Sequence, residues 1–443
     1  MSSFDLIVRG GTCVSHDGIG CADIAVRDGR IAGIGDFSQA AAAAEIVDAG
    51  GLHVLPGVID SQVHFREPGL EHKEDLESGS RAAVLGGVTA VFEMPNSRPT
   101  TTTTDALDDK LARAVGRMWC DHAFFVGADR ANISQLAALE RRPGCCGVKL
   151  FMGSSTGELL VENDEDIARV LASGTRRVAV HSEDEARLRE RHAIAVAAAD
   201  VHAHPKWRDA ETAARATRRL LGLARGVSRR VHVLHVTTAE EIAMLAEAKD
   251  IATVEVTPQH LTLVAPECHD RLGTLAQMNP PIRDQAHREA LWQGVREGVV
   301  DVLGSDHAPH SREEKAAPYP ASPSGMPGVQ TMLPLMLDHV AAGRLSLARL
   351  MDLLCAGPAR VYGIAGKGRL AVGYDADLTL VDLGAKRRIE ASWLASKCGW
   401  SPFEGREVRG WPVATIVRGR PVMREGELLG AAHGAPIRFQ ETR

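Results

Sequence analysis

Short runs of alternating apolar and polar residues occur at both ends of this chain, and a different pattern occupies the middle. Residues 6–8, 23–26 and 30–34 are short apolar runs with glycines between them, and residues 377–381 and 413–417 repeat the style. Alternation with a period of two predicts β-strands with one buried face. We therefore expect both ends to be rich in β-structure and to pack together as one small sandwich, which the rest of the chain interrupts.

The middle of the chain contains short β-type runs that alternate with stretches rich in Ala, Leu, Arg and Glu. Eight runs are predicted as strands, at about 54–65, 87–96, 121–127, 146–153, 177–184, 231–238, 252–258 and 300–309. Helices are predicted at about 73–86, 105–116, 164–173, 184–198, 209–226, 238–247, 286–298 and 346–355. This alternation predicts an α/β fold, a parallel (β/α)8 TIM barrel. A doubly wound open sheet is the alternative, but no glycine-rich dinucleotide turn follows the first strand.

These patterns divide the chain into three segments. Residues 1–52 are predicted to form the N-terminal part of the β-sandwich, 53–365 the barrel and 366–443 the C-terminal part of the sandwich. Interruptions at 184–230 and 308–345 leave room for loops over the barrel mouth.

Composition is that of an ordinary soluble protein and excludes several classes of partner. The chain has 443 residues and a net charge of −6, and no dense basic patch favours nucleic acid. Its first residues lack the basic start and apolar block of a signal peptide, and no apolar run reaches the ~18 residues of a membrane span. The eight cysteines include no Cys-x-x-Cys pair, which favours reduced thiols. We expect a cytoplasmic protein that acts on a small molecule.

Polar residues end most of the predicted barrel strands, where the catalytic residues of such barrels lie. They are Gln62, His64 and Arg66 on the first strand, then Asn96, Lys149, His181, His235 and Asp306 on later ones. A single histidine in such a place is more often a hydrogen-bonded structural residue than a ligand. Several at one rim favour a cation such as Zn²⁺, which histidines and carboxylates bind.

Lys149 does not fit a simple metal site. A buried ammonium group is costly and cannot bind a metal. Lys149 is therefore either an ion-paired or partly exposed lysine, or a lysine carbamylated by CO₂, which would supply anionic oxygen ligands.

Several motifs resemble those of the dihydroorotases, cyclic amide hydrolases of the amidohydrolase superfamily. They are His-Phe-Arg-Glu-Pro-Gly at 64–69, Glu-Met-Pro-Asn at 93–96, Met-Asn-Pro-Pro-Ile-Arg at 278–283 and Asp-His-Ala-Pro-His at 306–310. The resemblance covers essentially the whole chain, including the split sandwich. It implies reversible closure of N-carbamoyl-L-aspartate to L-dihydroorotate, a step of pyrimidine biosynthesis.

The resemblance also implies a role for each strand-end residue. One or two zinc ions would be held by His64, His181, His235, Asp306 and an N6-carboxylated Lys149. In the hydrolytic direction a zinc-bound hydroxide would attack the ring amide, with Asp306 as general base and acid. Arg66, Asn96 and His310 would hold the α-carboxylate of the substrate, and Asn279 would contact its ring.

One position departs from the family pattern. The family usually has a second histidine two residues before His64, and this chain has Gln62 there. An amide oxygen is a weaker zinc ligand than imidazole, so three outcomes follow: a weak ligand, a mononuclear site or an inactive one. Because the other ligands are present, and a subgroup similar to dihydroorotases carries glutamine here, we favour an active enzyme with an altered first metal site.

The same motifs also fit other functions. Allantoinase and dihydropyrimidinase or hydantoinase are expected to share the metal site, but their substrates lack the carboxylate that Arg66, Asn96 and His310 are suited to hold. A catalytically silent dihydroorotase-like scaffold subunit is a further alternative, which rests on Gln62 alone. We also expect a homo-oligomer, a dimer or tetramer, with possible association with aspartate carbamoyltransferase.

Overall fold

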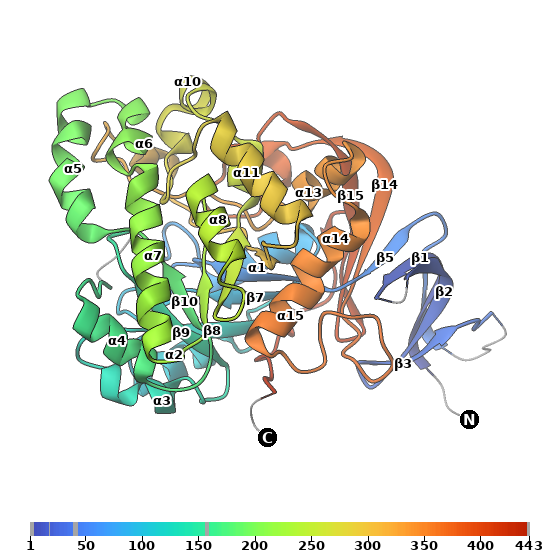
Figure 1. Cartoon of the computed structure of the whole chain (residues 1–443). Coiled ribbons are helices and arrows are strands. Elements are labelled where there is room, and N and C mark those ends of the chain that lie inside the picture. Colours follow the sequence, from blue (N-terminus) through green and yellow to red (C-terminus); the bar gives the residue numbers. More distant parts are fainter. Residues whose placement is uncertain (1–3, 17, 39–42, 156–158, 441–443) are drawn as a thin grey trace.

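A computed structural model describes residues 4–16, 18–38, 43–155 and 159–440 of the chain (Figure 1). Its centre is a sheet of eight parallel strands in sequence order. They are β6 (Val58–Val63), β7 (Val88–Glu93), β8 (Asp121–Gly127), β9 (Cys145–Phe151), β10 (Val178–His181), β11 (Val231–Val233), β12 (Ala252–Val256) and β13 (Val302–Leu303). A parallel bridge between Val63 and His307 joins the last strand to the first. The predicted barrel is confirmed.

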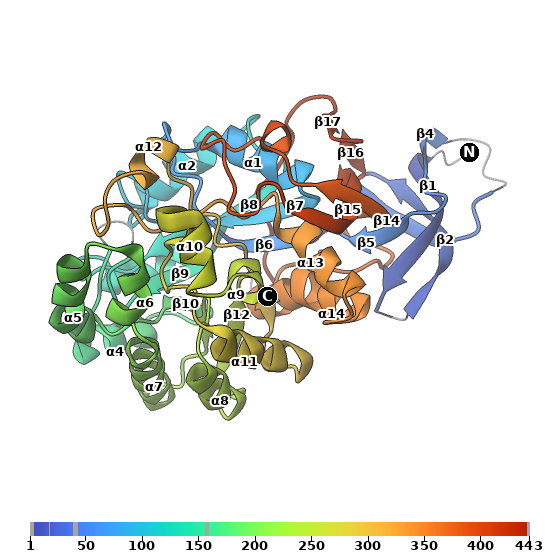
Figure 2. The same cartoon turned by 90° about the horizontal axis from the view of Figure 1, so that it is seen from above.

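Helices surround the barrel strands, as Figures 1 and 2 show. The longer ones are α1 (Leu76–Leu85), α2 (Thr104–Ala114), α4 (Asp164–Ala172), α5 (Glu185–Ala198), α7 (Ala210–Gly226), α8 (Ala239–Ala246), α11 (Gln285–Arg296) and α13 (Met332–Ala341). Shorter ones are α3 (Leu136–Leu139), α6 (His204–Trp207), α9 (Pro258–Thr262), α10 (Glu267–Leu272), α12 (Arg312–Lys315), α14 (Leu347–Met351) and α15 (Gly357–Tyr362). A π-helical turn, Asp352–Ala356, joins α14 to α15. Among the described residues, no helix is both long enough and apolar enough to span a bilayer.

Polar caps explain where the barrel helices begin. The side chains of Thr103, Asn163, Asp184, Asp209 and Asp284 accept hydrogen bonds from the first-turn amides of α2, α4, α5, α7 and α11. Such caps satisfy amides that have no partner within the helix. The apolar faces of the helices then pack on the strands in one large core, while Phe92, Phe125 and Tyr362 fill the barrel interior.

The two chain ends form a second, nine-stranded sheet beside the barrel (Figure 2). In spatial order its strands are β17 (Glu427–Leu428), β16 (Arg420–Arg424), β15 (Glu407–Val417), β14 (Leu378–Arg388), β5 (His53–Pro56), β1 (Phe4–Ser15), β2 (Gly18–Arg27) and β3 (Arg30–Gly35), with β4 (Ala43–Asp48) on β1. The pairing of β5 with β14 joins the N-terminal part to the C-terminal part. The expected union of the two ends is confirmed.

Two details differ from the sequence-based expectation. The apolar run at 54–65 is two strands, because the chain leaves the end sheet after β5 and enters the barrel at β6. Gly57 separates them, and a Cβ atom there would lie 2.3 Å from Thr89 Oγ1 and 2.5 Å from Asp377 Cβ. The segment 308–345, expected as loops, contains α12 and α13. Most of α13 is buried, so its sequence lacks the polar face that marks a surface helix.

Candidate active site

The predicted metal ligands lie together at the carboxyl ends of the barrel strands. His181 ends β10, Lys149 lies near the end of β9, and His64, His235 and Asp306 follow β6, β11 and β13. Each is at most 7% exposed. His235 and Asp306 adopt left-handed backbone conformations, with φ of 37° and 43°, which turn the chain sharply at the end of each strand. Such strain in two non-glycine residues is typical of a functional site.

Asp306 contacts two residues from the end of β6, Gln62 and His64. His64 Nε2 lies 3.2 Å from Asp306 Oδ1, and Gln62 Nε2 donates to the same oxygen over 3.0 Å. Burial opposes ionisation of Asp306, but the neighbouring side chains, His64 first and then His235 and Lys149, outweigh it. The pKa of Asp306 therefore lies well below its usual value, and this carboxylate is ionised at neutral pH.

Hydrogen bonding fixes the protonation of His64. Its Nδ1 lies 2.7 Å from Asn96 Oδ1, an acceptor, so Nδ1 carries the proton. Burial lowers the pKa of His64, which keeps the ring neutral and leaves a lone pair on Nε2. That lone pair faces the Asp306 carboxylate, an arrangement that a cation between the two atoms would satisfy.

Two histidine nitrogens face each other at the ends of β10 and β11. His181 Nε2 lies 2.9 Å from Glu183 Oε2, so this nitrogen is the donor and Nδ1 holds the lone pair. His181 Nδ1 lies 3.1 Å from His235 Nε2. Arg208, in the segment between α6 and α7, forms an ion pair with Glu183. Burial raises the pKa of Glu183, but Arg208 and His181 outweigh burial and hold this pKa well below its usual value. A carboxylate behind a histidine in this way orients it as a metal ligand.

Lys149 is buried without a counter-ion. Its side chain is 1% exposed, and no carboxylate oxygen of the described residues lies within 4.0 Å of its ammonium nitrogen. Its ammonium nitrogen lies 4.5 Å from the centroid of the Phe151 ring. Burial lowers the pKa of Lys149 to about 7, although Asp306 and Glu255 raise it. In a large fraction of the molecules at neutral pH, Lys149 is therefore the neutral amine, which is the form that reacts with CO₂.

These donors fit a zinc-type ion. Imidazole nitrogens with free lone pairs and an ionised carboxylate are ligands that Zn²⁺ accepts. The Gln62 Oε1 atom is buried without a hydrogen-bond partner among the described residues, which also suits a cation nearby. The amide nitrogen of Gln62 thus donates to Asp306, and its amide oxygen accepts no hydrogen bond from the described residues.

A second acidic group, elsewhere in the described chain, already has its cation. Oxygens of Asp121, Asp375 and Asp377 lie within 4.8 Å of one another. Lys367 Nζ lies 2.6, 3.2 and 2.5 Å from these three carboxylates. The buried ammonium group takes the place that a metal would need.

Arg66 is the unusual cation at the mouth. Its side chain is buried, its backbone has a φ of 65°, and its Nε donates to Pro309 O over 3.2 Å. Nη2 lies 3.4 Å from His310 Nε2, and Nη1 has no hydrogen-bond partner among the described residues. No carboxylate of the described chain lies within ion-pair distance of this guanidinium group, although burial without a counter-ion is unfavourable.

The other predicted substrate residues divide into two groups. Asn96 and His310 contact His64 and Arg66. Burial lowers the pKa of His310 to about 3, so this ring is neutral. Asn279 instead lies against His204 of α6, with Oδ1 3.0 Å from Nε2, and no hydrogen bond within the described chain joins it to Arg66, Asn96 or His310.

Two residues of the site were not expected from the sequence. Glu183, two residues after His181, could have been noticed from that spacing. Arg208 gave no signal, because it lies 25 residues from Glu183 and only the fold brings the two together.

Comparisons with known proteins agree with this geometry. Residues 53–422 match the amidohydrolase family. A dihydroorotase of Halobacterium salinarum is 40% identical over 422 residues, which cover 94% of this chain and 98% of that protein. An allantoinase of Rubrobacter xylanophilus is 37% identical and covers 100% of this chain and 99% of its own. The solved structure of an L-hydantoinase (dihydropyrimidinase) from Arthrobacter aurescens superposes with a TM-score of 0.93, at 32% identity over 98% of this chain and all of that one.

Proposed function

This chain belongs to the amidohydrolase family and is a cyclic amide hydrolase, and we propose that it is a zinc-dependent dihydroorotase. It would interconvert N-carbamoyl-L-aspartate and L-dihydroorotate in pyrimidine biosynthesis. The observation that carries the choice of substrate is Arg66, a buried guanidinium group without a carboxylate partner among the described residues. A substrate with its own carboxylate would supply the missing charge, and a guanidinium group binds a carboxylate through two parallel hydrogen bonds.

The residues of the mouth would divide the work as follows. His64, His181, His235, Asp306 and N6-carboxylated Lys149 would hold one or two zinc ions, which would polarise the ring carbonyl and acidify a water molecule. Asp306 would take a proton from that water and pass it to the leaving ring nitrogen. Asp306 is ionised at neutral pH, the state in which a carboxylate can accept a proton.

Binding would depend on the arginine side of the mouth. Arg66 would hold the α-carboxylate with its free Nη1 and with Nη2, next to the neutral His310 ring. Asn96, whose oxygen binds His64, would contact the same carboxylate through its amide nitrogen. Asn279 would contact the ring of the substrate.

Because the relatives include a hydantoinase and an allantoinase, the assay should compare three substrates. Purified, zinc-loaded protein should hydrolyse L-dihydroorotate with a kcat/KM at least ~10²-fold above that for hydantoin or allantoin, because only dihydroorotate carries the carboxylate that Arg66 lacks. Turnover of allantoin or hydantoin in preference would replace the proposed substrate.

An Arg66→Lys variant tests the pocket itself. A lysine keeps the charge but loses the two-pronged geometry, so KM for dihydroorotate should rise about ten-fold or more while kcat changes little. An unchanged KM with a lower kcat would remove Arg66 from carboxylate binding. Arg424→Lys, a surface arginine paired with Glu45, is the control and should change neither constant.

The cellular setting stays a prediction. We propose a cytoplasmic homo-oligomer, a dimer or tetramer, which could associate with aspartate carbamoyltransferase. Sedimentation of the purified protein, alone and with that enzyme, would measure both.

A further inference from the structure

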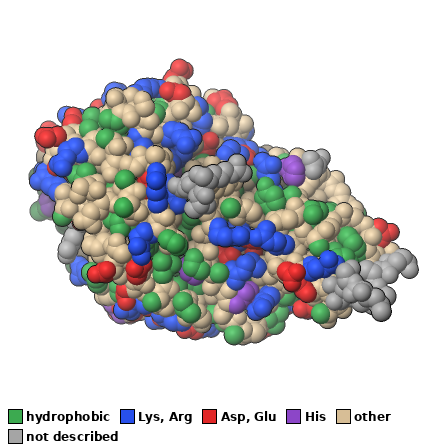
Figure 3. Space-filling model, turned by 90° about the horizontal axis from the view of Figure 1, so that it is seen from below, with side chains coloured by type: hydrophobic (Ala, Val, Ile, Leu, Met, Phe, Trp, Pro, Cys, Tyr) green, Lys and Arg blue, Asp and Glu red, His purple; other side chains and the backbone are tan. Residues whose placement is uncertain are grey.

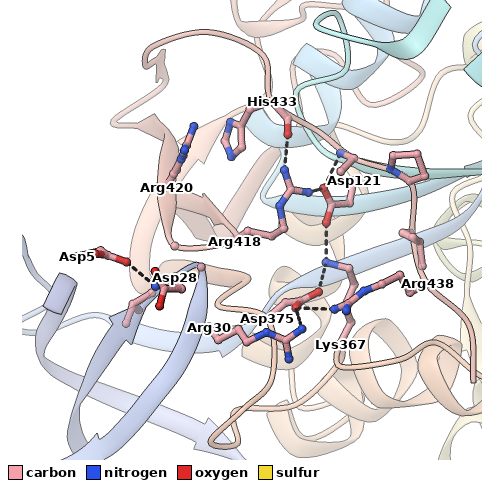
Figure 4. A pocket seen from close by; sticks show the side chains of 16 residues that line it. Asp5, Asp28, Arg30, Asp121, Lys367, Asp375, Arg418, Arg420, His433 and Arg438 are labelled. Atoms are coloured by element: carbon pink, nitrogen blue, oxygen red, sulfur yellow. Dashed lines mark hydrogen bonds and ion pairs between the residues drawn. The ribbon is translucent and has the colours of Figure 1, made fainter. Parts of the chain in front are cut away.

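A cavity of about 880 Å³ lies at the amino end of the barrel, far along the strands from the site described above (Figure 4). Its lining includes Asp121, the first residue of β8, whereas the candidate active site lies beyond the last residues of the strands. Residues 28–30, 418–420, 433 and 435–438 supply much of the wall. The volume is within the range of about 300–1,000 Å³ that is usual for small-molecule sites.

The carboxylates in the buried part of this cavity are engaged in ion pairs. Lys367 is held by Asp121, Asp375 and Asp377, and Arg418 pairs with Asp121 and donates to the His433 carbonyl. Figure 4 shows the links among Lys367, Asp121, Asp375 and Arg418. The acids here are therefore already engaged and contribute little free negative charge to the cavity.

The more exposed wall presents guanidinium groups with few protein acceptors. Arg420 makes no side-chain hydrogen bond or ion pair with any described residue, and Figure 4 shows it beside His433. Among the described residues, the Arg438 side chain pairs with Asp375 alone, over 3.2 Å, and Arg30 donates to Gly373 O and lies 3.9 Å from Asp375. Figure 3 shows Lys and Arg side chains gathered near the middle of the face seen from below. Most N–H groups of these three arginines remain available for a ligand.

Two carboxylates from the N-terminal sheet, Asp5 and Asp28, lie across the cavity from these arginines. Asp5 accepts a hydrogen bond from the Asp28 backbone amide, and both carboxylates lie on this side of the cavity (Figure 4). No cationic side chain of the described chain pairs with either of them. Carboxylates accept hydrogen bonds from hydroxyl groups and repel anions. The cavity thus has an anion-binding side and a hydroxyl-binding side.

We propose that this cavity binds a nucleoside polyphosphate. The phosphates would lie against Arg30, Arg420 and Arg438, because guanidinium groups match phosphate oxygens in bidentate geometry. The ribose hydroxyls would donate to Asp5 and Asp28. This site is separate from the barrel mouth and does not depend on the substrate proposed above.

Calorimetric titration with ATP, without magnesium and at low salt, tests the proposal. The full-length protein should bind ATP, and binding should weaken as salt rises because exposed charges are screened. The double variant Arg420→Gln/Arg438→Gln should bind ATP at least about ten-fold more weakly. Arg424→Gln, on the same strand β16 as Arg420 but outside the cavity lining, is the matched control and should bind like the parent.

Two further ligands distinguish a nucleotide from a free polyanion. Inorganic tripolyphosphate should bind more weakly than ATP to the parent, and adenosine should not bind. Asp5→Asn/Asp28→Asn should weaken ATP binding but strengthen tripolyphosphate binding, because the repulsion is removed. All variants should keep the parent's hydrolase activity, which shows that they are folded. The proposal is overturned if ATP does not bind, if Arg424→Gln weakens it as much as the double variant, or if tripolyphosphate binds as tightly as ATP.

Discussion

Two properties of the buried Asp306 side chain make it the candidate general base. It is ionised, and its Oδ1 is the common partner of His64 and Gln62. Asp306→Asn keeps the shape but removes the basicity, so kcat should fall by about 10²–10⁴-fold while the histidines retain much of the metal. Steady-state kinetics together with elemental analysis of the same sample would measure both. Asp250→Asn, at the surface, is the control, and activity within a few-fold of the parent would exclude Asp306 as the base.

Gln62 offers a second test at single-residue scale. Its Nε2 binds Asp306 and its buried Oε1 has no partner in the described chain, so the oxygen is the atom available to a metal. Gln62→His would replace this weak donor with imidazole and should raise the metal retained per chain after dialysis. Gln62→Leu should retain less than the parent. Equal metal content in all three proteins would show that position 62 does not face the ion.

At the scale of elements, Gly57 is the point where the chain changes from the end sheet to the barrel. A Cβ atom there would meet Thr89 Oγ1 and Asp377 Cβ, which belong to the barrel and to the segment before β14. Gly57→Ala should lower the free energy of unfolding by about 1–3 kcal/mol, the usual range for overpacking. Gly20→Ala is the matched control, since no atom lies within 4 Å of a Cβ atom at that exposed strand position. Urea denaturation would compare them, and equal midpoints would contradict the argument.

The same joint shows how far elements can be predicted from the sequence. Barrel strands buried on both faces appear as apolar runs, which is why all eight were found. Both sides of Gly57 are equally apolar, so the division between β5 and β6 had no sequence signal. The strand-end histidines, Lys149 and Asp306 were predictable because each follows an apolar run. Arg208 was not, because it comes from an insertion that only tertiary packing brings to the mouth.

At the scale of the whole molecule, a buried ion-pair cluster around Lys367 joins the barrel to the end sheet. Lys367 lies between Asp121 of β8 and two aspartates, Asp375 and Asp377, that precede β14. The three carboxylates raise the pKa of Lys367 far above its usual value, against the effect of burial. A group with a raised pKa in the folded state stabilises the fold at every pH below its unfolded value, so this contribution is fully present at neutral pH.

Removing this ammonium group should therefore loosen the connection between the two parts. Lys367→Met would leave three buried carboxylates without their cation, and the free energy of unfolding at pH 8 should fall by roughly 3–5 kcal/mol. In the variant the carboxylates would bind protons more readily when folded than when unfolded, so its deficit should shrink as the pH falls from 8 to 5. Chemical denaturation at both pH values would measure this, with Lys386→Met, an exposed lysine of β14, as the control. A deficit that stayed constant with pH would mean that lost packing, rather than lost charge, destabilises the variant.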